Sequence, residues 1–266
     1  MSATALRELM RARPVLGTFL KLPRPEVVDV LALTGFDFII CDLEHARIDQ
    51  RDWQQVLLAA PAHSLPVIVR TTGLDRGEIN HLLEGGAAGI QLPRTQSPAD
   101  VAALTALTRF PPIGSRSVGV AHLGAGYGSM PLSEYVDDER DAPLLVGQLE
   151  NRDLHEPLTE TLRGLDVAFV GTVDLSVECG APGALDHPAV ADKLATIEQA
   201  AAHAATTLGA FAPTPAAAAR FAAAGYRYLA VAGDLTMLTS GAERILNETR
   251  AALDAARATA TQPSAS

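Results

Sequence analysis

Short apolar runs alternate with longer segments of helical periodicity along most of this chain. Eight runs are nearly continuous in Val, Ile, Leu, Ala and Phe, which is typical of strands buried on both faces of a parallel sheet. They cover residues 15–22, 36–42, 66–70, 89–93, 144–150, 167–171, 209–212 and 226–232. The segments that follow predict helices at residues 25–35, 51–62, 75–84, 97–110, 154–163, 187–208, 215–224 and 235–258.

Eight strand–helix units predict an α/β fold, a closed (β/α)8 TIM barrel with an extra N-terminal helix and a C-terminal helical extension. An open doubly wound sheet is the alternative, but its first strand–helix turn usually contains a glycine-rich fingerprint. Here that turn, residues 20–25, reads LKLPRP and lacks glycine. We expect a single barrel domain over residues 1–258, followed by a small, polar and flexible tail over residues 259–266.

Residues 114–143 interrupt this rhythm, because they form a long stretch without strong periodicity. Part of the stretch, GVAHLGAGYGSM at residues 119–130, is rich in glycine. Long loops in compact domains are usually lids over a site or loops at an interface. A plain surface excursion is the alternative.

Composition excludes several classes of protein. The formal net charge of −10 argues against nucleic acid or an anionic membrane as the main partner. Two cysteines, Cys41 and Cys179, exclude a disulfide scaffold and a cysteine-rich metal site. Residues 1–13 lack the apolar core of a signal peptide, and no run approaches the roughly 20 apolar residues of a membrane span. We therefore expect a soluble, cytoplasmic protein.

Polar residues gather where the second, third, fifth and sixth strands end, which is where TIM barrels place their active sites. They are Asp42, Glu44, His45, Arg70, Gln148, Glu150 and Asp174. Glu150 and Asp174 follow adjacent strands, so their carboxylates could converge on a hard cation such as Mg²⁺ or Mn²⁺. The alternative is structural, with Glu150 paired to Arg152 and Asp174 capping a turn.

Arg70 and His45 are the candidates for acid–base and charge-stabilising chemistry. Arg70 has a permanent planar charge that suits a substrate carboxylate or a developing oxyanion, although an ion pair with Asp42 or Glu44 is the alternative. His45 carries an imidazole, the commonest general acid–base group in enzymes, and it follows two carboxylates directly after a strand, which favours a general base over a merely packed ring.

Six motifs, in order, carry a family resemblance that covers most of the chain. They are FDFIICDLEHARID (36–49), VIVRTTG (67–73), GAAGIQLPRTQS (86–97), RFPPIGSRSVG (109–119), GQLEN (147–151) and FVGTVDLS (169–176). This ordered set resembles the HpcH/HpaI aldolase family, the class II, metal-dependent pyruvate aldolases. The chain departs from the family pattern in FVGTVDLS, where a proline usually follows the glycine.

The resemblance implies a role for each matched residue. It implies that Glu150 and Asp174 bind a divalent cation, Mg²⁺, Mn²⁺ or Co²⁺. It implies that the keto acid contacts Gln148, Gly171, Thr172, Val173 and Asp174.

For the acid–base chemistry, the resemblance implies that His45 accepts the proton and that Arg70 stabilises the transition state. Glu84 stands where the family has an aspartate that raises the basicity of the histidine. Whether Glu84 or Asp42 orients His45 stays open.

The activity implied is reversible cleavage of 4-hydroxy-2-keto acids into pyruvate and an aldehyde, through a metal-stabilised pyruvate enolate. One alternative is a citrate-lyase-type carbon–carbon lyase acting on acyl-CoA, although the phosphates of CoA favour a basic patch that 21 dispersed Lys and Arg residues do not supply. Lys21 is the competitor for a Schiff-base mechanism, and an inactive binding module is the remaining alternative.

The family also implies a homo-oligomer, a hexamer built as a dimer of trimers with an exchanged C-terminal helix. Residues 235–258 have an apolar face that fits this expectation, because exposed apolar patches usually mark interfaces. We expect part of this segment to cover the barrel and the excess length to reach a neighbour. Packing of the excess across the bottom of its own barrel is the alternative.

Overall fold

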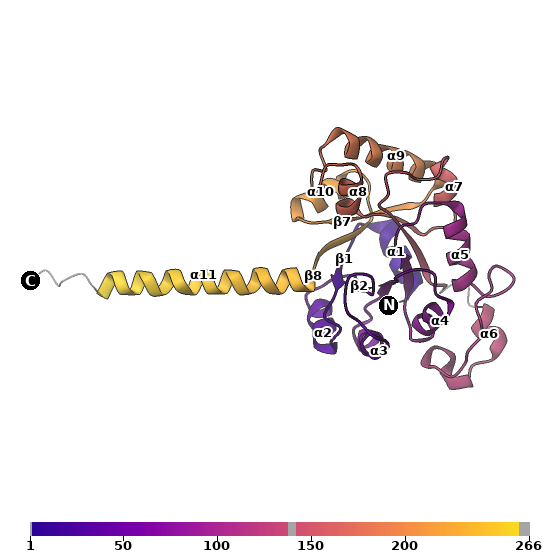
Figure 1. Cartoon of the computed structure of the whole chain (residues 1–266). Helices are drawn as coiled ribbons and strands as arrows, with labels where there is room; N and C mark the ends of the chain where they lie inside the picture. The colour runs from indigo at the N-terminus through magenta and orange to yellow at the C-terminus, as the bar shows by residue number, and fades with distance from the viewer. Residues whose placement is uncertain (1, 138–141, 261–266) are drawn as a thin grey trace, which may run out of the picture.

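The computed structural model describes residues 2–137 and 142–260. Its eight parallel strands pair in chain order, and β8 pairs with β1 to close the barrel (Figure 1). The strands are β1 (Val15–Leu20), β2 (Phe38–Asp42), β3 (Val67–Arg70), β4 (Gly89–Leu92), β5 (Leu144–Leu149), β6 (Val167–Val170), β7 (Thr207–Ala212) and β8 (Tyr228–Gly233). The predicted (β/α)8 TIM barrel is confirmed.

Helices connect the strands around the barrel. They are α1 (Ala3–Ala12), α2 (Pro25–Leu33), α3 (Gln50–Ala59), η1 (Ala60–His63), α4 (Arg76–Glu84), α5 (Pro98–Thr108), η2 (Leu123–Gly128), α6 (Leu132–Asp137), α7 (Leu158–Leu162), α8 (Thr172–Glu178), α9 (Pro188–Ala204), α10 (Pro215–Ala223) and α11 (Asp234–Ala260). The helix predicted at 187–208 was too long. Ala205, which follows α9, takes a left-handed φ of 56°, and Thr207 already belongs to β7, where it pairs with Val167 of β6.

The N-terminal helix α1 closes one end of the barrel. Leu6 and Met10 pack against the side chains that fill the barrel interior. Two ion pairs hold the helix in place, from Arg7 to Asp166 at the start of β6 and from Arg13 to Asp37 at the start of β2. Since these strands begin at that end, α1 covers the end opposite to the one where TIM barrels bind substrates.

The long excursion also lies at the end that α1 covers. It joins the end of α5 to the start of β5, and its described part contains η2 and α6. Residues 138–141 lie outside the described part. A lid over the mouth of its own barrel is therefore excluded for the described residues of this loop, whereas an interface loop or a surface excursion fits their position.

The C-terminal helix α11 does not cover the barrel, so that part of the prediction was wrong. Figure 1 shows this 27-residue helix projecting away from the other elements, and it contacts β8 and β1 near its start. Its apolar side chains Leu238, Ile245, Leu246 and Leu253 are exposed, and Leu16 on the outside of β1 is 43% exposed. Packing across the bottom of its own barrel is excluded as well.

Helix α11 continues through Ala260, while residues 261–266 of the predicted tail lie outside the described part. None of the helices in residues 2–137 and 142–260 combines the length and the apolar character needed to cross a membrane.

Candidate active site

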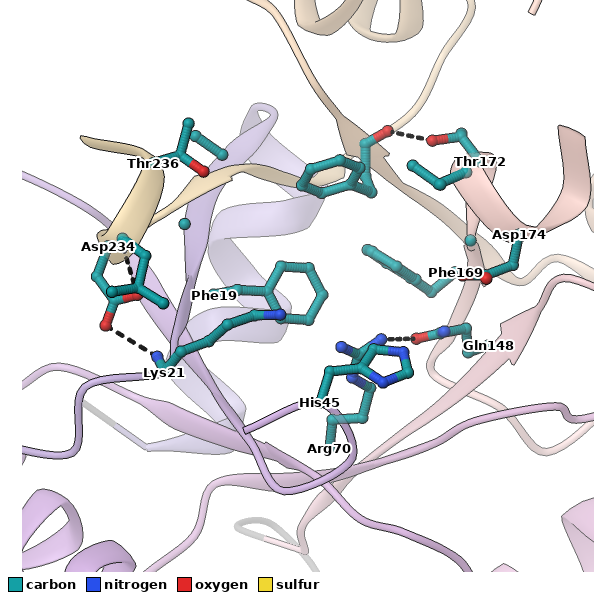
Figure 2. Close-up of a pocket in the computed structure, with 16 residues that line it drawn as sticks. Phe19, Lys21, His45, Arg70, Gln148, Phe169, Thr172, Asp174, Asp234 and Thr236 are labelled. Atoms are coloured by element: carbon teal, nitrogen blue, oxygen red, sulfur yellow. Dashed lines mark hydrogen bonds between the residues drawn. The ribbon is translucent and has the colours of Figure 1, made fainter. Parts of the chain in front are cut away.

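A cavity of about 460 Å³ opens at the carboxyl ends of the strands. Residues of seven strands or the loops after them line it, and Figure 2 shows His45, Arg70 and Lys21 reaching toward its centre. Its lining includes Phe19, Lys21, His45, Arg70, Gln148, Gly171, Thr172, Val173, Asp174, Phe211, Asp234 and Leu235. The structure thus brings together most of the residues predicted for the site.

A buried ion pair between Asp42 and Arg70 forms the base of the cavity. Arg70 donates from Nε to Asp42 Oδ1 at 2.9 Å and from Nη2 to Oδ2 at 2.8 Å, and its guanidinium lies 4.6 Å from the centre of the Phe19 ring. Asp42 is fully buried and Arg70 is 6% exposed. Burial raises the pKa of Asp42, but the hydrogen bond and charge of Arg70, with smaller help from Lys21 and an amide, lower it overall.

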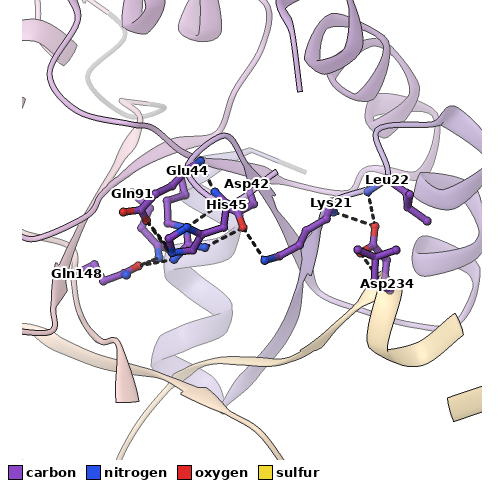
Figure 3. A network of polar contacts seen from close by, with 10 residues as sticks. Lys21, Leu22, Asp42, Glu44, His45, Gln91, Gln148 and Asp234 are labelled. Atoms are coloured by element: carbon purple, nitrogen blue, oxygen red, sulfur yellow. Dashed lines mark hydrogen bonds and ion pairs between the residues drawn. The ribbon is translucent and has the colours of Figure 1, made fainter. Parts of the chain in front are cut away.

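The ion pair continues into a polar network that crosses the mouth of the barrel (Figure 3). On one side, Lys21 Nζ lies 3.3 Å from Asp42 Oδ2. On the other, Arg70 Nη1 donates to Gln148 Oε1 at 3.5 Å, and Gln91 donates to the same oxygen. With its oxygen engaged in this way, the Gln148 amide turns its nitrogen toward Glu150 and donates to Oε2.

Glu150 ends this network as a carboxylate that is 4% exposed. Its Oε1 accepts the backbone N–H of Arg94 at 2.9 Å, and Arg94 has a left-handed φ of 50°. Burial raises the pKa of Glu150, the two hydrogen bonds oppose this, and the nearby charges of Glu44 and Asp174 raise it further. Negative charge therefore converges on Glu150, and it forms no ion pair within residues 2–137 and 142–260.

These features fit a divalent cation. The oxygen donors of Glu150 and Asp174 are of the hard type that Mg²⁺ and Mn²⁺ prefer. Gly171 leaves space beside Glu150, because a Cβ at this position would lie 2.8 Å from Glu150 Oε2. No group of three or more His, Cys, Asp and Glu side chains in the described chain could hold a metal. The chain would thus supply two carboxylates and leave other coordination positions to substrate and water.

His45 lies at the mouth with its side chain 52% exposed. Its backbone N–H donates to Asp42 Oδ1 at 3.2 Å, so Asp42 positions His45 through the main chain rather than through the ring. The carboxylate near the ring is Glu44, whose Oε2 lies 3.8 Å from His45 Nε2. The same Oε2 is 3.4 Å from Arg70 Nη1. His45 follows this carboxylate directly in the sequence, but no role beside the ring was predicted for Glu44.

Glu84 does not approach His45 within one chain. It is the last residue of α4, a helix that runs back from the mouth to the end of the barrel that α1 covers. There it lies against Gly119 of the long excursion. The expectation that Glu84 orients His45 is therefore not met inside the subunit, because the barrel separates the two residues.

Three further polar residues were not assigned to the site from sequence. Gln91 holds Gln148, and it could have been found as the amide in an otherwise apolar strand. Asp234 accepts the backbone N–H groups of Lys21 and Leu22, although it follows the eighth strand, which is not among the strands predicted to carry polar site residues. Lys21 is the cationic partner of Asp42, whereas a Schiff base requires a free amine.

The depressed pKa of Asp42 predicts a specific acid sensitivity. The charged form stabilises the fold above the unfolded-state pKa near 3.9, and this contribution is lost as the pH falls through the lower folded-state value. Asp42→Asn leaves Arg70 without its partner, so we expect a loss of roughly 3–5 kcal/mol at pH 7 that shrinks below about pH 4. Urea unfolding of both proteins from pH 7 to pH 3 measures this gap.

The matched control is Asp192→Asn, an exposed position on α9, which should stay within about 0.5 kcal/mol of the parent protein. A gap between Asp42→Asn and the parent that is constant over this pH range would contradict the depressed pKa of Asp42.

Comparison with known proteins agrees with this geometry. The HpcH/HpaI aldolase/citrate lyase family model matches residues 15–240. A 4-hydroxy-2-oxo-heptane-1,7-dioate aldolase of Salmonella arizonae is 33% identical over 248 residues, which are 91% of this chain and 92% of that protein. The crystal structure of a family member from Burkholderia cenocepacia J2315 matches with a TM-score of 0.85 at 30% identity, over 93% of this chain and 99% of that one.

The citrate synthase SbnG, at 22% identity and a TM-score of 0.84, covers 95% of this chain and 99% of its own, and it shows a shared fold alone. The family model, by contrast, matches residues 15–240, which include the residues of the cavity, and the aldolase relative is 33% identical over 91% of this chain. The chain is therefore a carbon–carbon lyase that belongs to the HpcH/HpaI aldolase/citrate lyase family.

Proposed function

We propose that this protein is a metal-dependent aldolase that reversibly cleaves 4-hydroxy-2-keto acids into pyruvate and an aldehyde. The observation that carries the proposal is the buried Glu150 carboxylate, on which the charges of Asp174 and Glu44 converge and which Gln148 joins to Arg70. The candidate cation-binding carboxylate and the fixed positive charge of Arg70 are thus connected through Gln148, which lines the cavity. The name of the Salmonella relative supports this class of substrate.

Glu150 and Asp174 would hold the cation, for which Mg²⁺, Mn²⁺ and Co²⁺ are the candidates. When bound, it supplies a Lewis acid that polarises the keto group of the substrate. Gln148 and the backbone from Gly171 to Val173 line the cavity beside these carboxylates and would orient the keto acid.

Arg70 would stabilise the negative charge that develops on the keto oxygen as the bond between C3 and C4 breaks. Its guanidinium is suited to this because Asp42, Gln148 and the Phe19 ring hold it in place before the reaction begins. A preorganised donor needs little rearrangement in the transition state.

His45 would take the proton from the 4-hydroxyl group in the cleavage direction and return it in the synthesis direction. Its ring reaches into the cavity from a backbone fixed by Asp42, and the Glu44 carboxylate would stabilise the ring once it is protonated.

A citrate-lyase-type reaction on an acyl-CoA is the second candidate, because the family includes citrate lyases. Its phosphates would need a basic surface. The lining of the cavity provides one lysine and one arginine, and Arg70 is engaged with Asp42, so the aldolase reaction fits this chain better.

Removal of the cation tests the proposal directly. Chelation should abolish pyruvate release from 4-hydroxy-2-oxoheptanedioate, followed with lactate dehydrogenase, and Mg²⁺, Mn²⁺ or Co²⁺ should restore it. Changes at residues that only support metal ligands typically weaken binding roughly 10- to 100-fold. Glu150→Gln and Asp174→Asn should each weaken cation binding by more than this, whereas Asp192→Asn should leave it unchanged. Full activity in chelated protein would overturn the metal-dependent class.

His45 is tested by its replacement with glutamine. His45→Gln should lower the rate of pyruvate release roughly 10²- to 10⁴-fold, the usual contribution of a general acid–base group, and added imidazole should restore part of it. His203→Gln is the matched control, because this ring is exposed on α9 and bonds only to Gln199 of its own helix. A near-normal rate for His45→Gln would show that His45 is not the acid–base group.

We also propose that the working species is a homo-oligomer, a hexamer formed by two trimers that exchange α11. Two observations support this: the projecting apolar side chains of α11 and the exposed Leu16 on the barrel surface that it leaves bare. An oligomer could also bring Glu84 close to His45 of another copy.

The assembly is tested by light scattering at micromolar concentration. We expect a particle several times the 27.9 kDa chain mass, and dissociation when the chain is truncated before Gly241 or when Ile245→Asp places a charge on the apolar face. Glu248→Gln, on the same helix, is the control. A measured particle mass near 27.9 kDa for the parent protein would overturn the proposed assembly.

A further inference from the structure

Lys21 is the more exposed of the lysine and the arginine that line the cavity. It follows β1, its side chain is 30% exposed, and Figure 2 shows it extended into the cavity above Phe19. Arg70, the other Lys or Arg of the lining, is 6% exposed and engaged with Asp42, Glu44 and Gln148. A negatively charged group entering this cavity would therefore meet the Lys21 ammonium first.

The ammonium also retains donors for such a group. It has three N–H bonds, and the structure gives its Nζ one contact, at 3.3 Å to Asp42 Oδ2. Asp42 meanwhile accepts two hydrogen bonds from Arg70 and one from each backbone N–H of Glu44 and His45. The carboxylate of Asp42 is thus shared among several donors, and the Lys21 ammonium keeps N–H bonds for another acceptor.

Asp234 fixes the backbone that carries this lysine. Its Oδ2 accepts the N–H of Lys21 at 2.8 Å and that of Leu22 at 2.7 Å, and Oδ1 accepts the N–H of Leu235 at 2.7 Å. Both oxygens are therefore directed at the main chain (Figure 3). Lys21 consequently extends from a fixed point on the rim of the cavity.

Lys21 and Glu150 lie at opposite ends of the polar network. The order is Glu150, Gln148, Arg70, Asp42 and Lys21, each in contact with the next. If the keto acid end of the substrate is held beside Glu150 and Arg70, as proposed above, the far end can extend toward Lys21. The lining on that side includes the apolar side chains of Phe19, Phe211 and Leu235.

We propose that Lys21 is a specificity-determining residue that binds a carboxylate at the far end of the aldehyde-derived half of the substrate. The inference rests on the proposed aldolase function and assigns to Lys21 the selection of aldehydes that end in a carboxylate, such as 4-oxobutanoate, over neutral aldehydes of the same shape. The apolar lining fits the chain, and the ammonium provides a charge-assisted hydrogen bond for its acidic end.

The test compares two aldehydes of equal shape in the aldol direction. Full-length enzyme with Mn²⁺ adds pyruvate to 4-oxobutanoate or to 4-methylpentanal, in which two methyl groups replace the carboxylate oxygens. We expect the parent enzyme to prefer 4-oxobutanoate in kcat/KM. Lys21→Met should lower the ratio of the two values roughly 10- to 100-fold, the range for a hydrogen bond to a charged group, and Lys21→Arg should preserve most of it.

Lys193→Met is the matched control, because Lys193 is the other lysine of the chain and lies on α9, away from the cavity. It should leave the ratio unchanged. An unchanged ratio in Lys21→Met, or an equal fall of both values, would overturn the proposal, since an equal fall means that Lys21 only supports Asp42 and Arg70.

Binding provides a readout that does not depend on turnover. Calorimetry with 2-oxoheptanedioate and 7-methyl-2-oxooctanoate, which lack the 4-hydroxyl group and cannot undergo cleavage, should show a preference for the dicarboxylate that Lys21→Met removes. A parent enzyme inactive on both aldehydes would overturn the aldolase function, while this binding comparison would still decide the role of Lys21.

Discussion

The buried pair of Asp42 and Arg70 is the interaction on which the rest of the site depends. Either charge alone would be costly in this position, because breaking a buried pair leaves an uncompensated ion. Together they connect the ends of β2 and β3 and pack beside Phe19 of β1. Asp42 then fixes the backbone of His45, and Arg70 fixes Gln148. Candidate catalytic groups from different strands thus share one electrostatic centre.

The barrel and most of its mouth could be predicted from sequence, because both follow from local pattern. Near-continuous apolar runs identify strands, and chain order places residues such as Arg70 and Glu150 at the same end of parallel strands. Gln91 and Gln148 illustrate what pattern alone omits. Each is a single amide within an apolar strand, and only the register of β4 with β5 brings their side chains together.

Glu84 and α11 show what local sequence patterns leave open. The family resemblance implies a role for Glu84 beside His45, but the helix that follows β3 places Glu84 at the opposite end of its own barrel. The apolar spacing of Leu238, Ile245 and Leu253 identifies an interacting face, yet it does not specify which surface that face meets. Both questions concern distances between elements, which local periodicity does not encode.

The hydrogen bonds of Asp234 join two parts of the molecule that are otherwise separate. The same carboxylate holds the first residues of α11 and the backbone of Lys21 on the rim of the cavity. The direction in which the helix leaves the barrel is thus mechanically coupled to the position of a cation at the active site. Coupling of this kind is reciprocal, so in the proposed oligomer any influence of neighbouring subunits on the cavity has an equal counterpart in the influence of substrate on subunit association.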